Sequence, residues 1–158
     1  MRSLLLHIKI LDMKRSVLLL LFIGLVGLTQ AQIRKIPAEV TDAFSSRYPH
    51  AQKVSWKDKI SSFEAEFILN GFEMSADFSN KGDWERTERK IKFSDLHGEV
   101  MDGFAKSKYA DWEKVSVVEI DESGEPIVYR LLVKKSGLQK KYLFFSATGK
   151  LNREALTL

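Results

Sequence analysis

The chain has 158 residues, with 25 Lys and Arg, 21 Asp and Glu, and no cysteine. This length suits one domain, or two small fused ones, with a hydrophobic core of workable size. The lack of cysteine excludes disulfides, thiol catalysis, the common zinc sites and a lipid attached through cysteine. Packing alone must therefore stabilise the fold.

Three consecutive features near the N-terminus are typical of a secretory signal peptide. Lys14 and Arg15 precede the apolar run SVLLLLFIGLVGL, and a short segment follows that ends at Ala31. The apolar run is shorter than the roughly 20 residues that a membrane-spanning helix needs. We therefore predict a signal peptide over residues 1–31, cleavage after Ala31, and a periplasmic or extracellular protein with no stable membrane insertion. An uncleaved membrane anchor is the alternative.

Cleavage after Ala31 also changes the charge of the chain. The remaining 127 residues carry 21 basic and 20 acidic side chains, so the formal charge falls from +4 to +1. The basic character therefore belongs mainly to the signal and does not indicate a nucleic-acid partner. Met1 and Met13 both remain possible start residues, because a signal requires nothing before Met13.

The first element of the mature chain is a predicted helix. Pro37 suits its first turn, where the missing N–H would be unpaired, and Pro49 ends it. Apolar residues at helical spacing form one stripe along it. The stripe consists of Ile36, Val40, Phe44 and Tyr48.

Four predicted strands follow this helix. The first contains Trp56, and the next two, residues 63–69 and 72–78, alternate apolar and polar side chains around the turn dipeptide Asn70-Gly71. Residues 84–91 form the fourth strand. Its five charged side chains indicate a solvated edge strand, because charge on an edge discourages association.

The same pattern then starts again. Leu96, Val100 and Phe104 lie 60 positions after Ile36, Val40 and Phe44. Alternation in the later hairpin predicts that Ile127, Tyr129, Leu131 and Val133 are buried. We therefore predict an α+β protein of two tandem repeats, residues 36–91 and 93–155, each with one helix packed on its own four-stranded antiparallel sheet. The two repeats are expected to form one structural domain.

The order of motifs resembles a known family. Ile-Pro, a helix, Tyr-Pro, a Trp-bearing strand, a meander and Gly-Asp-Trp are similar to the PepSY-like secreted bacterial proteins, described as β-lactamase-inhibitor-like, over nearly all of residues 36–152. The resemblance implies an exported binding module without catalytic residues, similar in architecture to tandem-repeat inhibitors of β-lactamase. Those inhibitors use disulfides and particular loop residues. This chain has neither, so inhibition is an analogy at the level of the fold.

Motifs that would indicate catalysis are missing from the sequence. His50 and His97 lack the spacing of metal ligands, and no nucleophile elbow, P-loop or dinucleotide fingerprint occurs. Glu64 and Glu66 share a strand face and could act as a general acid and base, but polar alternation on an exposed face is the ordinary explanation. The sequence therefore predicts no enzyme, no cofactor and no metal site.

Two features are candidates for binding a partner. The first is a group of four lysines around the predicted turn Ser136-Gly137, with solvated tip lysines as the alternative explanation. These lysines are Lys134, Lys135, Lys140 and Lys141. The second is Trp112, which follows the second predicted helix and is the best candidate for an exposed aromatic anchor. Trp56 and Trp84 are instead expected in the core.

These observations favour an exported, non-catalytic module that binds a protein or peptide of the cell envelope and inhibits or regulates it. A periplasmic carrier or sensor of a small ligand, held in a pocket between sheet and helices, is the alternative. The sequence identifies neither the partner nor the oligomeric state.

Overall fold

The computed structural model describes residues 34–136 and 139–157 of the chain. The predicted signal peptide, residues 1–31, therefore lies outside the described residues. The helices and strands described here belong to the unit Lys35–Leu158. They are α2 (Ala38–Arg47), β1 (Gln52–Lys59), β2 (Ser62–Leu69), β3 (Phe72–Ser79), β4 (Trp84–Ile91), η2 (Phe93–Asp95), α3 (Gly98–Ala105), β5 (Glu113–Glu122), β6 (Val128–Lys134), β7 (Lys140–Ser146) and β8 (Leu151–Leu156).

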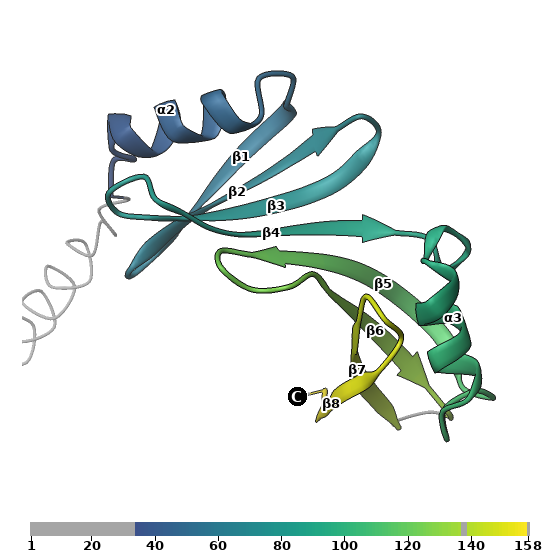
Figure 1. Ribbon diagram of the computed structural model, residues 1–158. Coiled ribbons are helices and arrows are strands. Elements are labelled where there is room, and N and C mark those ends of the chain that lie inside the picture. Colours follow the sequence, from purple (N-terminus) through teal and green to yellow (C-terminus); the bar gives the residue numbers. More distant parts are fainter. Residues whose placement is uncertain (1–33, 137–138, 158) are drawn as a thin grey trace, which may run out of the picture. The chain divides into compact units, whose positions relative to one another are not determined.

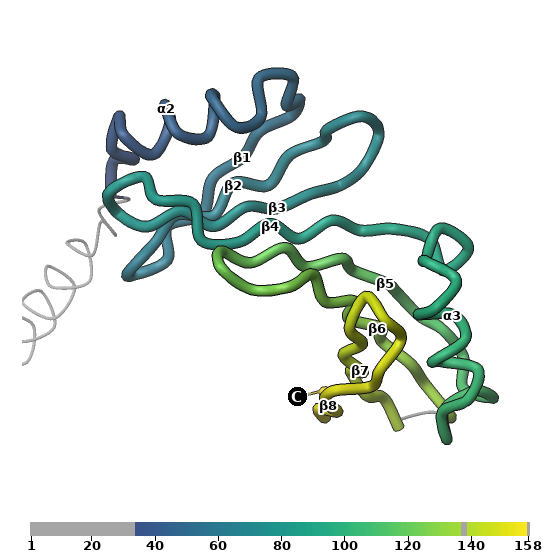
Figure 2. Tube along the Cα trace, in the orientation of Figure 1, coloured from purple at the N-terminus to yellow at the C-terminus, as the bar shows by residue number. Residues whose placement is uncertain are grey.

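All eight of these strands form one antiparallel sheet in the order of the sequence, from β1 to β8. The trace winds back and forth between neighbouring strands (Figure 2). β4 pairs with β5 from Arg86 opposite Glu122 to Ile91 opposite Val117. The prediction of two tandem repeats, each with a helix on its own four-stranded sheet, is therefore wrong. The described residues form one eight-stranded sheet with the two short α-helices α2 and α3 (Figure 1).

The charges on β4 explain this error. They predicted an edge strand, but cross-strand partners neutralise them within the sheet, so β4 accepts a neighbour on both sides. Lys90 Nζ lies 2.5 Å from Glu73, Arg89 lies 2.9 Å from Glu119, and Arg130 lies 2.6 Å from Glu88. A sequence pattern shows which residues of a strand are charged, but not whether another segment supplies residues of opposite charge beside them.

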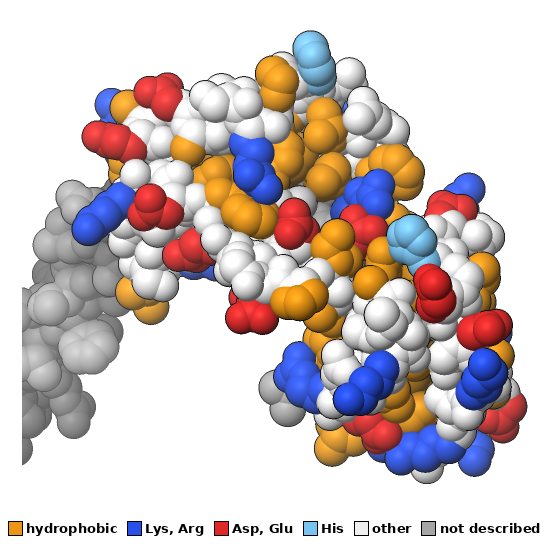
Figure 3. Space-filling model, viewed as in Figure 1, with side chains coloured by type: hydrophobic (Ala, Val, Ile, Leu, Met, Phe, Trp, Pro, Cys, Tyr) orange, Lys and Arg blue, Asp and Glu red, His pale blue; other side chains and the backbone are white. Residues whose placement is uncertain are grey.

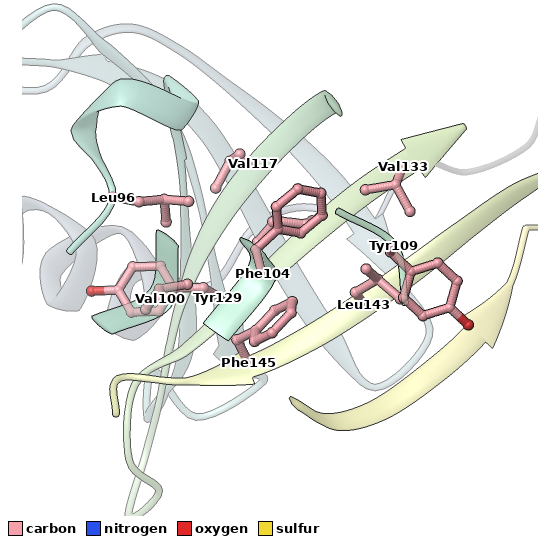
Figure 4. Close-up of a cluster of buried hydrophobic side chains, with 10 residues drawn as sticks. Leu96, Val100, Phe104, Tyr109, Val117, Tyr129, Val133, Leu143 and Phe145 are labelled. Carbon is pink, nitrogen blue, oxygen red and sulfur yellow. The ribbon is translucent and has the colours of Figure 1, made fainter. Parts of the chain in front are cut away.

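Two hydrophobic clusters stabilise the helix-bearing face of the sheet. Val40 and Phe44 of α2 pack on β2 and β3, where Phe63, Phe67 and Phe78 are buried. The second cluster joins α3 to β5, β6 and β7, and its side chains point toward one another in Figure 4. It contains Leu96, Val100, Phe104, Tyr109, Val117, Tyr129, Leu131, Val133, Leu143 and Phe145.

Two glycines allow turns of the sheet to lie against the first turns of the helices. Gly82 has φ +86°, and a Cβ there would lie 2.5 Å from the carbonyl oxygen of Glu39 in α2. Gly149 has φ +77°, and a Cβ there would lie 2.0 Å from the carbonyl oxygen of Glu99 in α3. Both positions therefore need glycine for its positive φ and for the close backbone approach.

The burial of individual side chains agrees with the sequence in most places. Trp56 and Trp84, predicted in the core, are half-buried and pack against the first cluster without being among its buried residues. Thr87 is buried between the helix and the sheet, where it shares a hydrogen bond with Tyr48 Oη and accepts one from Trp84 Nε1. Ile127 was predicted to be buried, but it is 39% exposed because β6 begins only at Val128.

Truncating the central aromatic residue of either helix should destabilise the fold strongly. We expect Phe44→Ala and Phe104→Ala each to lower the free energy of unfolding by about 3–5 kcal/mol, because each ring is buried and would leave a cavity. Urea denaturation measures this change. The exposed Ser46→Ala in α2 is the control and should be nearly neutral. Nearly neutral phenylalanine variants would contradict the packing of these helices on the sheet.

Candidate functional site

The strands present two faces with different surroundings. Successive side chains alternate between the faces, so the residues between the buried ones lie on the face that the helices do not cover. We call this surface, formed by the alternate residues of β1–β8, the helix-free face. Figure 3, in the orientation of Figure 1, shows acidic, basic and hydrophobic side chains interspersed over the side on which α2 and α3 are visible.

The helix-free face of β1–β4 carries a network of ion pairs. Lys59 Nζ lies 2.6 Å from Glu64 and 2.9 Å from Asp77, and Asp77 also accepts a hydrogen bond of 2.8 Å from Arg86. Lys57 Nζ lies 2.6 Å from Glu66. Glu64 and Glu66 are thus satisfied by lysines, an arrangement that accounts for them without acid–base chemistry. Partly exposed pairs of this kind contribute little to stability individually.

An arginine continues this network into the second half of the sheet. Arg130 of β6 donates two hydrogen bonds to the carboxylate of Glu88 in β4, with N···O distances of 3.1 and 2.6 Å. The strand between them, β5, places Val118 and Ile120 on the same face, and each is only 8% exposed although no described helix covers it. The long side chains of the neighbouring strands therefore shield two aliphatic residues that belong to neither helix-side cluster.

The helix-free face of β5–β8 combines apolar side chains with arginines and other charged residues. The strand register places Val118, Arg130, Phe144 and Arg153 in one row across four strands. The guanidinium of Arg153 stacks on the Phe144 ring, with its central carbon 3.7 Å from the ring centroid, and Arg130 lies 5.6 Å from the centroid of Tyr142. Aromatic and arginine side chains are the types enriched at the energetic centres of protein interfaces.

A hollow of about 810 Å³ opens on this part of the face. Its lining comes from β4–β8 and from the turn between β5 and β6, and includes Ile127, Phe144 and Arg153. The lining mixes apolar and charged side chains.

The four lysines predicted as a binding patch are divided between the two faces. Lys134 and Lys140 lie opposite each other in the β6–β7 pair, and Lys134 Nζ is 3.5 Å from Glu113. Lys141 lies opposite Val133 and so faces the helix side. Lys135 is exposed in the turn, and the predicted turn residue Gly137 lies outside the described residues. A role of these lysines in binding a partner stays a prediction.

Lys141 belongs to a polar cluster that joins β8 to the segment after α3. Tyr109 Oη donates a hydrogen bond of 2.5 Å to Glu154, which also lies 2.9 Å from Lys108 and 3.2 Å from Lys141. The hydrogen bond from Tyr109 and the contact with Lys108 lower the pKa of Glu154 to about 2. The ion pairs and the hydrogen bond therefore link β8 to the segment after α3.

Trp112 lies beside this cluster. Its ring is half-buried and meets the ring of Tyr109 edge-on, with a centroid distance of 5.0 Å and an interplanar angle of 88°. Packing against the second hydrophobic cluster thus accounts for much of its surface. Its role as an anchor for a partner stays a prediction.

The sequence analysis missed the arginines and aromatics of the helix-free face. Arg130, Tyr142, Phe144 and Arg153 are ordinary members of alternating strands, and alternation assigns them only to the side opposite the core. A row across β5–β8 depends on register, which strand pairing decides. The sequence did contain one indication of this surface, because two aromatic residues, Tyr142 and Phe144, occupy positions of β7 that alternation assigns to the polar side.

The described residues hold no obvious centre for catalysis or metal binding. Within residues 34–136 and 139–157, no group of three or more His, Asp and Glu side chains is arranged to hold a metal ion. Each buried polar side-chain atom in the same ranges has a hydrogen-bond partner. The helices of this part of the chain are also too short or too polar to cross a membrane.

In the described residues, α2 and α3 pack on one face of a single antiparallel sheet, and no described helix covers the other face. The model of the family described as "Putative beta-lactamase-inhibitor-like, PepSY-like" matches residues 61–153. The chain belongs to this PepSY-like family. No curated protein matches it.

Several solved structures share the fold. A BLIP-like protein from Bacteroides fragilis NCTC 9343 is 25% identical with a TM-score of 0.74, covering 79% of this chain and 89% of its own. A DUF2874 family protein from Bacteroides uniformis ATCC 8492 is 26% identical with a TM-score of 0.72, covering 75% and 88%. A protein described as a "putative periplasmic" one from Bacteroides eggerthii DSM 20697 is 22% identical with a TM-score of 0.73, covering 77% and 89%.

Removing the hydroxyl of Tyr109 should make Glu154 a stronger base. Because the pKa of Glu154 is lowered from 4.5 to about 2, its contribution to stability is present above pH of about 4.5 and is lost as the pH falls toward about 2. We expect Tyr109→Phe to raise the pKa of Glu154. The variant should then lose less stability than the wild type when the pH falls from about 4.5 to about 2. Titration of the Glu154 carboxyl carbon by NMR measures the first effect, and Tyr142→Phe, on the other face, is the control. An unchanged midpoint in Tyr109→Phe would exclude this role of the tyrosine.

Proposed function

We propose that this protein is an exported, non-catalytic module that binds a protein of the cell envelope or exterior through the helix-free face of its sheet. The carrying observation is the row across β7 and β8, where the half-buried Phe144 and the exposed Arg153 lie side by side, next to Arg130 of β6. A surface of this composition is typical of protein interfaces. By regulating its partner, the module would act as an inhibitor or as an adaptor.

The comparisons support the class of function proposed. The family description is inhibitor-like, and one solved relative is described as BLIP-like. A relative described as periplasmic supports the proposed location. We place the signal peptide at residues 1–31, with cleavage after Ala31, and one folded domain at residues 36–155.

A carrier of small ligands finds less support in the packing. A ligand pocket was expected between the sheet and the helices, where Phe44, Phe67 and Phe78 instead pack against one another, with ring centroids 5.1 and 6.2 Å from that of Phe44. Phe104 and Phe145 lie 6.5 Å apart under α3. Aromatic rings therefore fill the space directly beneath α2 and α3.

Export should remove the first 31 residues. The basic pair, the short apolar run and the residues before Gln32 predict a mature N-terminus at Gln32. Intact-mass measurement of the protein recovered from the periplasm or the medium checks this. A mass that retains residues 13–31 would contradict cleavage and favour the membrane anchor.

Partner contact should be confined to one face. We expect a photo-crosslinking residue at Tyr142, on the helix-free face, to capture a protein from an envelope extract, identified by mass spectrometry. The same residue at Ser46, exposed on α2, is the matched control and should capture nothing specific. Capture at Ser46 alone, or at neither position, would contradict the proposal.

The lysines of the β6–β7 hairpin provide a separate comparison in the same assay. If Lys134, Lys135, Lys140 and Lys141 steer the partner, replacing all four with glutamine should reduce capture more at low salt than at high salt. Folding should change little, because the exposed Lys135 and Lys140 and the partly exposed ion pairs of Lys134 and Lys141 each contribute little to stability. If the quadruple variant captured the partner as well as the wild type at every ionic strength, these four lysines would have no role in binding.

A further inference from the structure

Arg153 differs from the other two arginines that line the hollow on the helix-free face. Arg86 donates to Asp77 at 2.8 Å, and Arg130 forms a two-fold hydrogen bond with Glu88. Among the described residues, no carboxylate lies within ion-pairing distance of Arg153. Its guanidinium instead stacks on the Phe144 ring, with Cζ 3.7 Å from the ring centroid. One of three arginines therefore has a guanidinium that no acidic side chain of this part of the chain satisfies.

The stack orients this free guanidinium. Phe144 and Arg153 are directly opposite in the β7–β8 pair, so the register holds the arginine over the ring. A guanidinium that lies on an aromatic ring keeps its N–H groups at its edges, where a planar carboxylate can accept two parallel hydrogen bonds. Arg153 is also exposed on the last strand of the sheet, so a partner can reach it.

Apolar surface lies next to this donor in the same hollow. Ile127 is 39% exposed, and Pro126 and the half-buried Phe144 also line the space. A large apolar side chain placed there would be removed from water while a neighbouring carboxylate reaches Arg153. Recognition would thus require both groups close together in one segment.

The charges around the hollow set the direction in which such a segment binds. Glu122 and Glu125 line it from the end of β5 and from the turn to β6, whereas Arg153 lies on β8, beyond both β6 and β7. Arg86 lies opposite Glu122 but is paired with Asp77, so the two glutamates make this end of the hollow less favourable for a carboxylate than the end at Arg153. The partner's acidic residue should therefore lie toward β8 and its apolar residue toward Phe144 and Ile127.

We propose that the hollow between the β5–β6 turn and β8 is a recognition site for a protein segment that presents a carboxylate beside a large apolar side chain, with Arg153 on Phe144 as the group that selects the carboxylate. This inference rests on the proposed function, because it names the chemistry of the partner that the helix-free face would bind. It makes Arg153 a specificity-determining residue.

Short peptides test this site without knowledge of the natural partner. The probe is the blocked hexapeptide Gly-Ser-Phe-Asp-Ser-Gly, compared with versions in which Asp is replaced by Asn or Phe by Ala. NMR titration of the mature protein follows the side-chain Nε–H of Arg153 and the amides of β7 and β8. We expect saturable shifts at Arg153 and Phe144 with the Phe-Asp peptide, and an affinity at least about tenfold lower for each altered peptide.

Variants of the protein provide the second arm of the experiment. Arg153→Gln should lower the affinity for the Phe-Asp peptide by at least about tenfold and remove the preference for Asp over Asn. Arg153→Lys should retain only part of that preference, because lysine lacks the planar guanidinium that donates two parallel hydrogen bonds to a carboxylate. Arg47→Gln is the matched control, because Arg47 also stacks on an aromatic ring, Trp84, at 3.7 Å, but from the helix-bearing side. It should leave the affinity unchanged.

The outcomes separate this inference from the proposed function. Shifts confined to other surfaces, no binding of the Phe-Asp peptide, equal binding of the Asp and Asn peptides, or an unaltered affinity in Arg153→Gln would each overturn the recognition site. If crosslinking at Tyr142 still captured a protein in that case, the helix-free face would remain the binding face with another partner chemistry. An amide spectrum of Arg153→Gln that matches the wild type outside β7 and β8 shows that the variant is folded.

Discussion

The pairing of β4 with β5 is the interaction on which the rest of the structure depends. It runs from Arg86 opposite Glu122 to Ile91 opposite Val117 and joins eight strands into one sheet. Without it, β4 and β5 would each have an unpaired edge, and the two helix-side clusters would stabilise separate small sheets. With it, side chains from both halves of the chain share one surface. The contact of Arg130 in β6 with Glu88 in β4 exists only because β5 lies between them.

The alternation of side chains divides the sheet into a face that stabilises and a face that is free to recognise. Aromatic and aliphatic residues beneath α2 and α3 account for the buried clusters. The opposite face carries ion pairs over β1–β4 and an apolar row with arginines over β5–β8. Substitutions on that face change few core contacts, so its composition can vary while the fold is kept.

The solved relatives share the fold at 22–26% identity. A fold of this kind does not fix a partner. In this chain the difference between Arg130, saturated by Glu88, and Arg153, stacked on Phe144 without a carboxylate, is the feature that points to a particular chemistry. Two arginines of the same row thus have different roles because their neighbours differ.

The sequence by itself determined the local elements and the sides on which their apolar residues lie. The spacing of Val40 and Phe44 defined a helix with one buried face, Asn70-Gly71 defined a hairpin, and the order of motifs identified the family. These features depend on neighbours within a few residues, which a sequence displays directly. The prediction that Ile127 is buried was wrong, because Ile127 lies in the turn and β6 begins only at Val128.

Only the tertiary structure decided that the strands form one sheet and that a hollow opens on its helix-free face. The charged side chains of β4 suggested an edge, because the segments that supply their partners, Glu73, Glu119 and Arg130, are up to 42 positions away. The row that includes Phe144 and Arg153 likewise depends on strand register. Charge compensation and cross-strand neighbours are set by pairing between distant segments, and the periodicity of a single strand does not contain that information.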